Sequence, residues 1–279
     1  MRIVITGSDG QLGRALQGVF ESDDICLVDL PKHDITKTAE VVPSLRAFHP
    51  ELVIHCAALT NVDGCEQDPN LAELVNVVGT RNVASVAQLS ECPMVYVSTD
   101  YVFDGTMEGE YSEWDPPAPQ SVYARTKWLG EQTARQMVRQ LYVVRVAWLY
   151  GDGPRNFVRT VLRLARKGGL IRMVTDECGS PTYAADVAQA LSRLVTTSAY
   201  GTYHLPNAGV CSRYDWAAAI LDGAGLRDSV ALEPTTDYQR AATVPKRVAL
   251  RNYYGAREGI VMRPWQEALA QYLESLQGE

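Results

Sequence analysis

The sequence lacks the marks of metalloproteins, membrane proteins and secreted proteins. Its six cysteines include no C-x-x-C pair, and none lies at metal-site spacing from the four histidines. No apolar run approaches the roughly 18 residues that a membrane-spanning helix needs. A strand-like run begins at residue 2, which leaves no room for a signal peptide. We therefore expect a cytoplasmic protein with reduced cysteines, no metal site and no membrane segment.

The sequence also lacks a basic cluster. Its 33 acidic residues outnumber the 26 Lys and Arg residues, so the formal net charge is −7, and the basic residues are scattered. Nucleic acids and anionic membranes bind basic patches, so we expect neither as a partner. What the chain of 279 residues does have is 46% apolar content. That is enough for one large core, or for one core and a smaller lobe.

In the first half of the chain, short β-rich apolar runs alternate with longer segments of helical spacing. The strand-like runs cover residues 2–6, 25–29, 52–55, 94–98 and 142–146, and helical spacing covers 71–89 and 123–140. Such alternation predicts right-handed crossovers and a parallel sheet with helices on both faces. The expected fold is therefore a doubly wound, Rossmann-like α/β sheet.

The order of elements changes after residue 150. Helices are predicted over residues 157–167, 183–197, 214–224 and 265–276, with a strand over 171–175 and turn-rich stretches between. We expect a dinucleotide-binding domain over residues 1–150 and a smaller, mainly substrate-binding lobe over 151–279. Some segments at about 171–205 are expected to return to the first domain.

A glycine-rich turn follows the first strand. The stretch TGSDGQLG places Gly7, Gly10 and Gly13 before a helix. Glycines permit a tight turn and let the backbone approach a pyrophosphate, whose charge the helix N-terminus attracts. An ordinary strand-to-helix connection can also be rich in glycine. The context at the end of the next strand favours a dinucleotide site.

Asp29 ends the second strand, 22 residues after Gly7. A carboxylate at this position can accept hydrogen bonds from the adenosine ribose, or it can simply cap a turn. Its charge favours NADH, whereas Lys32 and His33 close by can tolerate the 2′-phosphate of NADPH. The choice between the two cofactors stays open at this point.

Two polar motifs complete a candidate site. The stretch VYVSTDYVFDG (95–105) begins as a buried strand and turns polar at Ser98, Thr99 and Asp100, and SVYARTK places Tyr123 and Lys127 four residues apart on one helical face. Y-x-x-x-K alone also occurs on solvated helices. Ligands of doubly wound sheets bind beyond the carboxyl ends of the strands, so we expect the polar residues of the strand to leave the core and enter this site.

The chemistry of ketone reduction explains these residue types. The reaction needs a hydride on carbon and a proton on oxygen, and an ordinary tyrosine, with a pKa of about 10, holds its proton tightly. A neighbouring ammonium stabilises the phenolate. We therefore expect Lys127 to lower the pKa of Tyr123 and to bind the nicotinamide ribose. The Thr99 hydroxyl would hold the substrate carbonyl against Tyr123.

Over nearly its whole length the sequence resembles the extended short-chain dehydrogenase/reductase superfamily, and within it the dTDP-4-dehydrorhamnose reductase family. The resemblance is carried by TGSDGQLG, HCAALTNVDGCE (55–66), STDYVFDG (98–105), YARTK, RVAWLYG (145–151), VTDECGSPTYAADVA (174–188), GTYHLPNAG (201–209) and PWQEAL (264–269). Several of these motifs are specific to the reductase branch.

The resemblance implies roles for individual residues. The catalytic residues would be Thr99, Tyr123 and Lys127. The cofactor would be held by Gly7, Gly10, Gln11, Leu12, Gly13, Asp29, Asp34, Ile35, Ala57, Ala58, Thr60, Tyr123 and Lys127. The sugar pocket would be formed by Thr60, Val62, Thr99, Asp100, Tyr101, Phe103, Tyr123 and Trp148. Trp148 is expected to stack on the apolar face of a sugar ring, although it could also be a core tryptophan.

The reaction that the resemblance implies is reduction of the C4 ketone of dTDP-4-dehydro-L-rhamnose by NADPH, or by NADH, to dTDP-L-rhamnose. Two alternatives remain: a reductase of another 4-keto sugar nucleotide, and a noncatalytic NADP-binding regulatory subunit. A nucleotide-sugar dehydratase is disfavoured. Such enzymes carry Asp-Glu after the threonine, because elimination needs a carboxylate to remove a carbon-bound proton, whereas Tyr101 follows Asp100 here.

The sequence departs from the family pattern at two places. His55 stands where the family often has asparagine, and Arg14 and Ala15 stand where some members carry a glutamate that helps to hold magnesium between two subunits. A missing carboxylate and an added guanidinium disfavour a divalent cation. We expect a monomer, or a homodimer that forms without metal.

Overall fold

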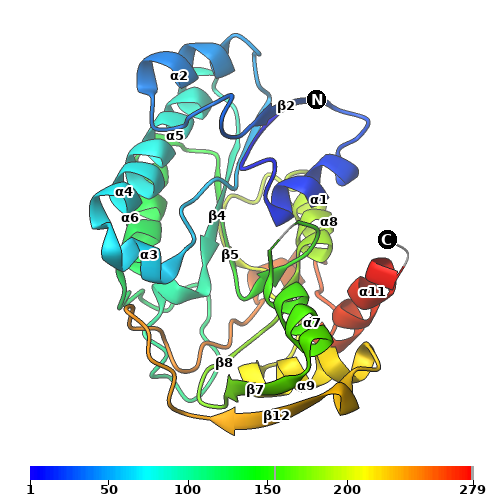
Figure 1. Cartoon of the computed structure of the whole chain (residues 1–279). Coiled ribbons are helices and arrows are strands. Elements are labelled where there is room, and N and C mark those ends of the chain that lie inside the picture. Colours follow the sequence, from blue (N-terminus) through cyan, green and yellow to red (C-terminus); the bar gives the residue numbers. More distant parts are fainter. Residues whose placement is uncertain (154, 278–279) are drawn as a thin grey trace.

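The computed structural model describes residues 1–153 and 155–277. Its centre is a six-stranded sheet in the order β10-β5-β4-β3-β1-β2, in which every neighbouring pair is parallel (Figure 1). Its strands are β1 (Arg2–Thr6), β2 (Asp24–Val28), β3 (Leu52–His55), β4 (Met94–Thr99), β5 (Leu141–Val146) and β10 (Gly201–His204). The predicted doubly wound fold is confirmed.

Helices cover both faces of this sheet (Figure 1). On one face α1 (Gln11–Val19) packs against α8 (Ala184–Leu194). On the other face lie α2 (Thr38–Arg46), α3 (Val62–Gln67), α4 (Pro69–Glu73), the π-helix η1 (Leu74–Gly79), α5 (Thr80–Leu89) and α6 (Val122–Met137). A short 3₁₀ turn, η2 (Asp100–Val102), follows β4.

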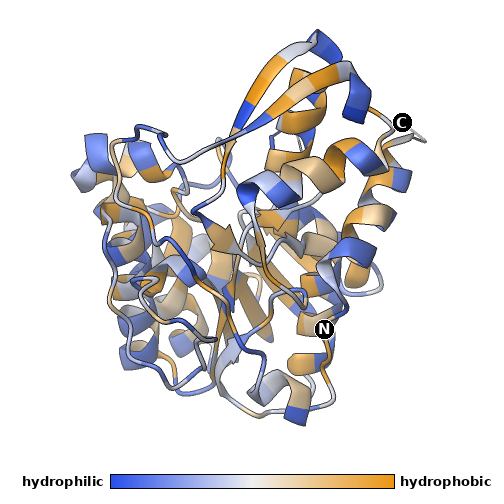
Figure 2. Cartoon of the chain, turned by 90° about the horizontal axis from the view of Figure 1, so that it is seen from below, coloured by the Kyte–Doolittle hydropathy of each residue, from blue (hydrophilic) through white to orange (hydrophobic). Residues whose placement is uncertain are grey.

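The central strands are apolar because both of their faces are covered. All residues of β3, β4 and β5 are buried, which is typical of a parallel sheet between two helical layers. One apolar cluster joins the sheet to α1 and α8, and a second joins it to α2, α5 and α6. Figure 2 shows these strands at the centre of the molecule, mostly in the hydrophobic colour.

The second lobe lies below the sheet in Figure 1 and has its own apolar cluster, which includes Trp216 and Tyr272. Its helices are α7 (Phe157–Lys167), α9 (Arg213–Gly223), α11 (Trp265–Gln277) and the 3₁₀ turn η3 (Arg227–Ser229). The short helix α10 (Tyr254–Arg257) lies instead against β10 of the central sheet. Its strands form three pairs: β7 (Gly169–Val174) with β12 (Val230–Thr235), β8 (Cys178–Gly179) with β11 (Cys211–Ser212), and β6 (Leu149–Tyr150) with β9 (Thr182–Tyr183).

The predicted elements exist, with shifted boundaries. The helix predicted over 71–89 runs from Pro69 to Leu89 and contains the π-helical stretch η1, which the apolar periodicity does not indicate. The helix predicted to reach residue 140 ends at Met137, because Val138 is extended. Within the region 171–205, α8 and β10 belong to the central sheet and its cover, whereas β7 pairs with β12. The division into two domains stays a prediction.

The topology of the sheet creates a place for a ligand. Strand β1 lies between β2 and β3. The connection from β1 leads to β2 at one edge of the sheet, and the next connection leads back to β3 on the other side of β1. In open parallel sheets, ligands bind at such a switch point, beyond the carboxyl ends of the strands. The glycine-rich turn follows β1 directly.

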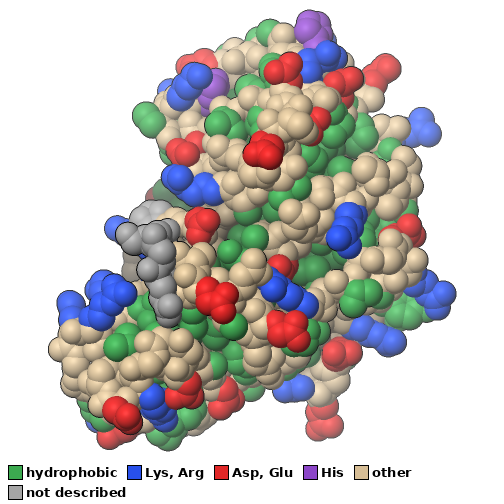
Figure 3. Space-filling view, turned by 90° about the vertical axis from the view of Figure 1, so that its right-hand side faces the viewer, with side chains coloured by type: hydrophobic (Ala, Val, Ile, Leu, Met, Phe, Trp, Pro, Cys, Tyr) green, Lys and Arg blue, Asp and Glu red, His purple; other side chains and the backbone are tan. Residues whose placement is uncertain are grey.

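The surface agrees with the scattered charges of the sequence. On the face shown in Figure 3, Lys and Arg side chains are interspersed with Asp and Glu side chains. Across residues 1–153 and 155–277, no helix is both long and apolar enough to cross a membrane. The cytoplasmic location stays a prediction.

Candidate active site

A cavity of about 630 Å³ extends from the glycine-rich turn to the second lobe. This volume lies within the usual range of ligand pockets, about 300–1,000 Å³. All residues predicted to hold the cofactor line it: Gly7, Gly10, Gln11, Leu12, Gly13, Asp29, Asp34, Ile35, Ala57, Ala58, Thr60, Tyr123 and Lys127. The residues predicted for the sugar also line it, except Phe103.

The glycine-rich turn has the form that a pyrophosphate requires. Gly7 has a φ of 68°, and a Cβ there would lie 2.7 Å from the backbone nitrogen of Ala57. A Cβ at Gly13 would overlap the carbonyl oxygen of Gly7. Helix α1 has no side-chain cap at Gly10, so its first N–H groups face the cavity without a side-chain acceptor. This end of the cavity therefore fits an anionic group.

Asp29 lies just beyond β2 and supports the turn. One carboxylate oxygen accepts a hydrogen bond of 2.9 Å from the backbone N–H of Asp9, and the other accepts one of 2.9 Å from that of Leu30. Each oxygen can accept a further bond. Asp29 therefore both holds the glycine-rich turn and presents a carboxylate to this end of the cavity.

The other polar residues at this end of the cavity differ in their hydrogen bonds and in whether they line the cavity. Asp34 accepts hydrogen bonds from the backbone N–H and the hydroxyl of Thr36, and these bonds lower the pKa of its carboxyl group. His33 lines the cavity, and its buried Nδ1 has no hydrogen-bond partner among the described residues. Lys32 is exposed and is not among the residues that line the cavity.

Strand β4 continues through Thr99, one residue further than predicted. The Thr99 hydroxyl donates to Oδ1 of Asp100 over 3.0 Å and accepts from the backbone N–H of Tyr101 over 3.2 Å. Burial raises the pKa of Asp100 to about 7. Ser98 behaves differently, because its hydroxyl donates to Oε1 of the buried Glu131 over 2.6 Å. All three polar residues line the cavity, as expected. The Thr99 hydroxyl and the Asp100 carboxyl group point toward each other, whereas the Ser98 hydroxyl is held by Glu131.

Tyr123 lies in the first turn of α6. This helix begins after Ser121, whose hydroxyl caps it by accepting from the backbone N–H of Ala124. Burial raises the pKa of Tyr123, and a hydrogen bond with Thr99 opposes this rise. Burial is thus the largest influence on the pKa of Tyr123 in this structure, and the expected lowering of that pKa by Lys127 stays a prediction.

Lys127 is buried beside the same cavity. Its Nζ donates to the carbonyl oxygen of Val97 over 2.8 Å and lies 4.4 Å from the centre of the Tyr96 ring. Burial lowers the pKa of Lys127 to about 8, while the carboxylate of Glu131 opposes that change. With one proton donated to Val97, the ammonium keeps two protons for other acceptors.

Phe103 is a correction to the predicted sugar pocket. Its side chain is fully buried in a separate apolar cluster. The ring stacks on Tyr111 with a centroid distance of 4.3 Å. Phe103 therefore stabilises the loop after β4 and does not line the cavity.

Trp148 lines the cavity, but with a different environment from the one expected. The carbon of the Arg213 guanidinium lies 3.5 Å from the centre of its ring. A Cβ at Gly179 would lie 2.6 Å from Cε2 of the indole, so the ring also lies against β8. The face that Arg213 covers is not free to stack on a sugar in this structure, and stacking by the rest of the ring stays a prediction.

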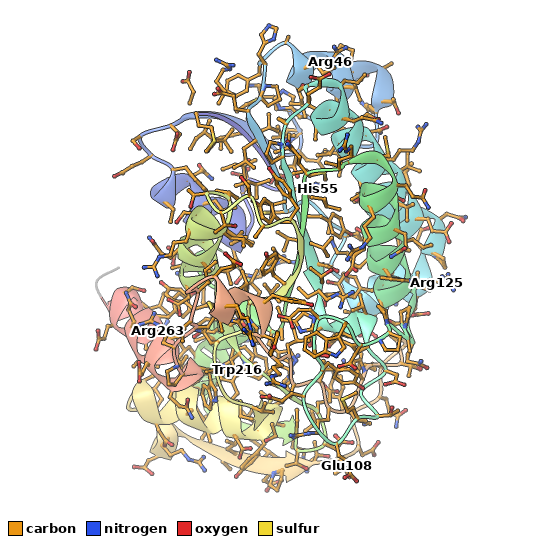
Figure 4. All side chains as sticks on the ribbon, turned by 180° about the vertical axis from the view of Figure 1, so that it is seen from behind. Arg46, His55, Glu108, Arg125, Trp216 and Arg263 are labelled. Atoms are coloured by element: carbon orange, nitrogen blue, oxygen red, sulfur yellow. The ribbon has the colours of Figure 1, made fainter. Side chains whose placement is uncertain are left out.

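Arg213 is the functional candidate that the sequence analysis missed. It comes from α9 and reaches the cavity because β11 pairs with β8. Nearby, Trp216 lies in the interior of the lower lobe in Figure 4. Nothing in the local stretch CSRYDW indicates this position, since it depends on a strand pairing between distant segments.

His55, the departure from the family pattern, lies in the interior of the molecule (Figure 4). Its Nδ1 lies 2.6 Å from the Thr6 hydroxyl, and its Nε2 lies 3.0 Å from the Thr80 hydroxyl. Burial lowers the pKa of His55 to about 3. The ring is therefore neutral at physiological pH and joins β1 to β3 and α5.

The site that binds magnesium in some relatives differs here. Nε of Arg14 donates to the carbonyl oxygen of Asp9, and its guanidinium lies 3.8 Å from the Asp9 carboxylate. Within the part of the chain that the structure describes, no three His, Cys, Asp or Glu side chains are grouped so that they could hold a metal ion.

Comparison with known proteins gives one consistent result. The family model described as the RmlD substrate binding domain matches residues 1–277. A dTDP-4-dehydrorhamnose reductase of Mycobacterium tuberculosis is 38% identical over 280 residues, covering 96% of this chain and 91% of that protein. The crystal structure of a dTDP-4-dehydrorhamnose reductase of Clostridium acetobutylicum superimposes with a TM-score of 0.95 at 37% identity, covering 99% and 100% of the two chains. The crystal structure of a dTDP-4-dehydrorhamnose reductase of Bacillus anthracis in complex with NADP superimposes with a TM-score of 0.94 at 38% identity. The match covers 98% of this chain and 99% of that chain.

Proposed function

Because this chain belongs to the family of the RmlD substrate binding domain, we propose that it reduces the C4 ketone of dTDP-4-dehydro-L-rhamnose to dTDP-L-rhamnose with NADPH. The observation that supports this proposal is one cavity that is lined by the glycine-rich turn at one end and also by Thr99, Tyr123 and Lys127. The family relatives include reductases of this name and an NADP complex.

The chain's own residues would hold the cofactor at both ends. The N-terminus of α1 would bind the pyrophosphate, and Asp29 would accept from the adenosine ribose. The remaining ammonium protons of Lys127 would bind the nicotinamide ribose. The reduced nicotinamide would supply the hydride that the reaction needs.

Tyr123 would supply the proton. Its phenol is held protonated by burial, so it is ready to donate to an oxygen that gains negative charge. Thr99 would hold the ketone oxygen near the phenol, once its hydroxyl turns from Asp100. Lys127 then limits the cost of the phenolate after the proton has left, because a nearby ammonium stabilises that anion.

One assay separates this proposal from its alternatives. Purified protein is mixed with NADPH and with dTDP-4-dehydro-L-rhamnose, made from dTDP-glucose by an upstream dehydratase and epimerase. Substrate-dependent loss of absorbance at the NADPH band, with dTDP-L-rhamnose as the product, supports the proposal. NADPH binding without turnover on any 4-keto sugar nucleotide would support a regulatory subunit, and turnover only on another sugar would support the other alternative.

Cofactor preference provides a test of Asp29. Replacing Asp29 with alanine removes a carboxylate that repels a 2′-phosphate, so we expect the ratio of kcat/KM for NADPH to that for NADH to rise by roughly tenfold, about 1.4 kcal/mol. The ratio is the proper measure, because loss of the bond to Asp9 can weaken both cofactors. Asp24→Ala, at the exposed far end of β2, is the matched charge control. An unchanged ratio in Asp29→Ala would mean that Asp29 does not reach the ribose.

Assembly should not depend on a divalent cation. Arg14 occupies the region in which some relatives carry a magnesium-binding glutamate, and its charge opposes a cation there. We therefore expect a monomer, or a dimer built on other surfaces, with the same mass and activity in magnesium and in EDTA. Light scattering and the reductase assay measure both. A dimer that dissociates and loses activity on chelation would show that other carboxylates form the site.

A further inference from the structure

Arg213 occupies a fixed position at the lobe end of the cavity. It is the first residue of α9, directly after Ser212, whose hydroxyl and backbone N–H pair reciprocally with Asp215 in a capping box. The preceding strand β11 is paired with β8. Both ends of this segment are therefore held, and the guanidinium projects from a rigid helix start to the cavity.

The guanidinium is oriented by two contacts. Its carbon lies over the ring of Trp148, 3.5 Å from the ring centre, and its Nε lies 3.7 Å from Oε2 of Glu177. The other oxygen of Glu177 is 3.0 Å from Nη2 of Arg240. The terminal nitrogens of Arg213 form no hydrogen bond with another of the described residues. Trp148 and Glu177 thus hold the guanidinium in place and leave its outer edge available.

The outer edge of the Arg213 guanidinium matters because most charged side chains around the cavity are acidic. The cavity is lined by the carboxyl groups of Asp9, Asp29, Asp34 and Asp100, and in the described part of the chain the lysine and arginine side chains that line it are those of Lys127 and Arg213. Lys127 lies at the sheet, where it donates to Val97 and is assigned to the nicotinamide ribose in the proposed function. A diphosphate brought to the lobe end near Asp100 would therefore meet repulsion unless Arg213 offsets its charge.

We propose that Arg213 recognises the diphosphate of the sugar nucleotide, with Trp148 and Glu177 holding its guanidinium for that contact. This inference rests on the proposed function, since it assigns a residue to that substrate. A planar guanidinium suits the task because its paired N–H groups match phosphate oxygens, which a lysine ammonium does not. Trp148 then contributes by supporting Arg213, and not by stacking on the sugar.

Arg240 provides a matched control. Arg213 and Arg240 both pair with Glu177, so loss of either changes the charge around that carboxylate. Only Arg213 of the two lines the cavity. A purely structural role in balancing Glu177 predicts similar effects of both substitutions, whereas recognition of a diphosphate predicts an effect of Arg213 alone.

The test measures binding of dTDP by calorimetry and of NADPH by fluorescence, for the wild-type protein and for Arg213→Met, Arg213→Lys and Arg240→Met. Methionine keeps an apolar chain against Trp148 but removes the charge. We expect Arg213→Met to weaken dTDP binding by about 10- to 100-fold, the scale of a hydrogen bond to a charged group. NADPH affinity and kcat should change little, KM for the sugar nucleotide should rise, Arg213→Lys should recover part of the loss, and Arg240→Met should resemble wild type.

Three results would overturn the inference: unchanged dTDP binding in Arg213→Met, equal losses in Arg213→Met and Arg240→Met, or a parallel loss of NADPH affinity that indicates general damage. Failure of the proposed function is a different outcome. A protein that binds dTDP through Arg213 but reduces no ketone would retain this inference and lose the reductase assignment. A protein that reduces the ketone but binds dTDP equally well without Arg213 would retain the reductase assignment and lose this inference.

Discussion

Replacing Tyr123 with phenylalanine is expected to lower kcat by at least about 100-fold, the usual scale for loss of a general acid. The substitution removes one oxygen atom at a buried position, and the ring can keep its edge contact with Tyr101, 5.9 Å away between centroids. Affinity for NADPH should therefore stay close to wild type. Stopped-flow measurement of a single turnover, alongside fluorescence titration of NADPH, separates the chemical step from binding.

Tyr142→Phe is the control for this substitution. Tyr142 lies in the apolar cluster of β5 and is not among the residues that line the cavity, so its variant should turn over as the wild type does. If Tyr123→Phe kept more than about a tenth of the wild-type rate, the proton would have to come from another group. Asp100, whose pKa burial raises to about 7, would then be the group to examine.

The features of the fold that are local in sequence could be predicted. The strand runs, the glycine-rich turn and the spacing of Tyr123 and Lys127 are set by neighbouring residues, and the structure contains each of them. The position of Arg213 could not be predicted, because it depends on the pairing of β8 with β11 across more than thirty residues of chain. Sequence spacing does not show which distant segment will face a cavity.

Two aromatic residues show a second limit. Phe103 and Trp148 both belong to motifs of the family pattern, yet Phe103 stacks on Tyr111 in a separate core while Trp148 reaches the cavity beneath Arg213. Apolar side chains serve a core or a site equally well, and only packing distinguishes the two. The pKa of Tyr123 also depends on packing that the sequence does not show. The spacing places Lys127 on the same helical face, but it does not reveal how strongly burial raises the pKa of the phenol.

Glu131 and Arg145 form a buried ion pair behind the cavity. We expect this pair to affect both the stability of the fold and the pKa of Lys127. Glu131 and Arg145 are buried and form two hydrogen bonds, from Nε to Oε1 over 3.0 Å and from Nη2 to Oε2 over 2.9 Å. Ser98 donates a third bond to Glu131. Glu131→Leu would leave a buried guanidinium without its carboxylate, so we expect the free energy of unfolding to fall by about 3–5 kcal/mol. Urea denaturation followed by circular dichroism measures this loss.

The double variant Glu131→Leu with Arg145→Met separates stability from chemistry. With both charges removed, apolar packing should restore much of the lost stability, as replacement of whole buried pairs often does. Lys127 would nevertheless lose the carboxylate that opposes the fall of its pKa, so its pKa should drop further below about 8. Its ammonium would then lose its proton at lower pH, and the alkaline limb of the profile of kcat/KM against pH should move to lower pH. A stable double variant with an unmoved alkaline limb would show that Glu131 serves the fold alone.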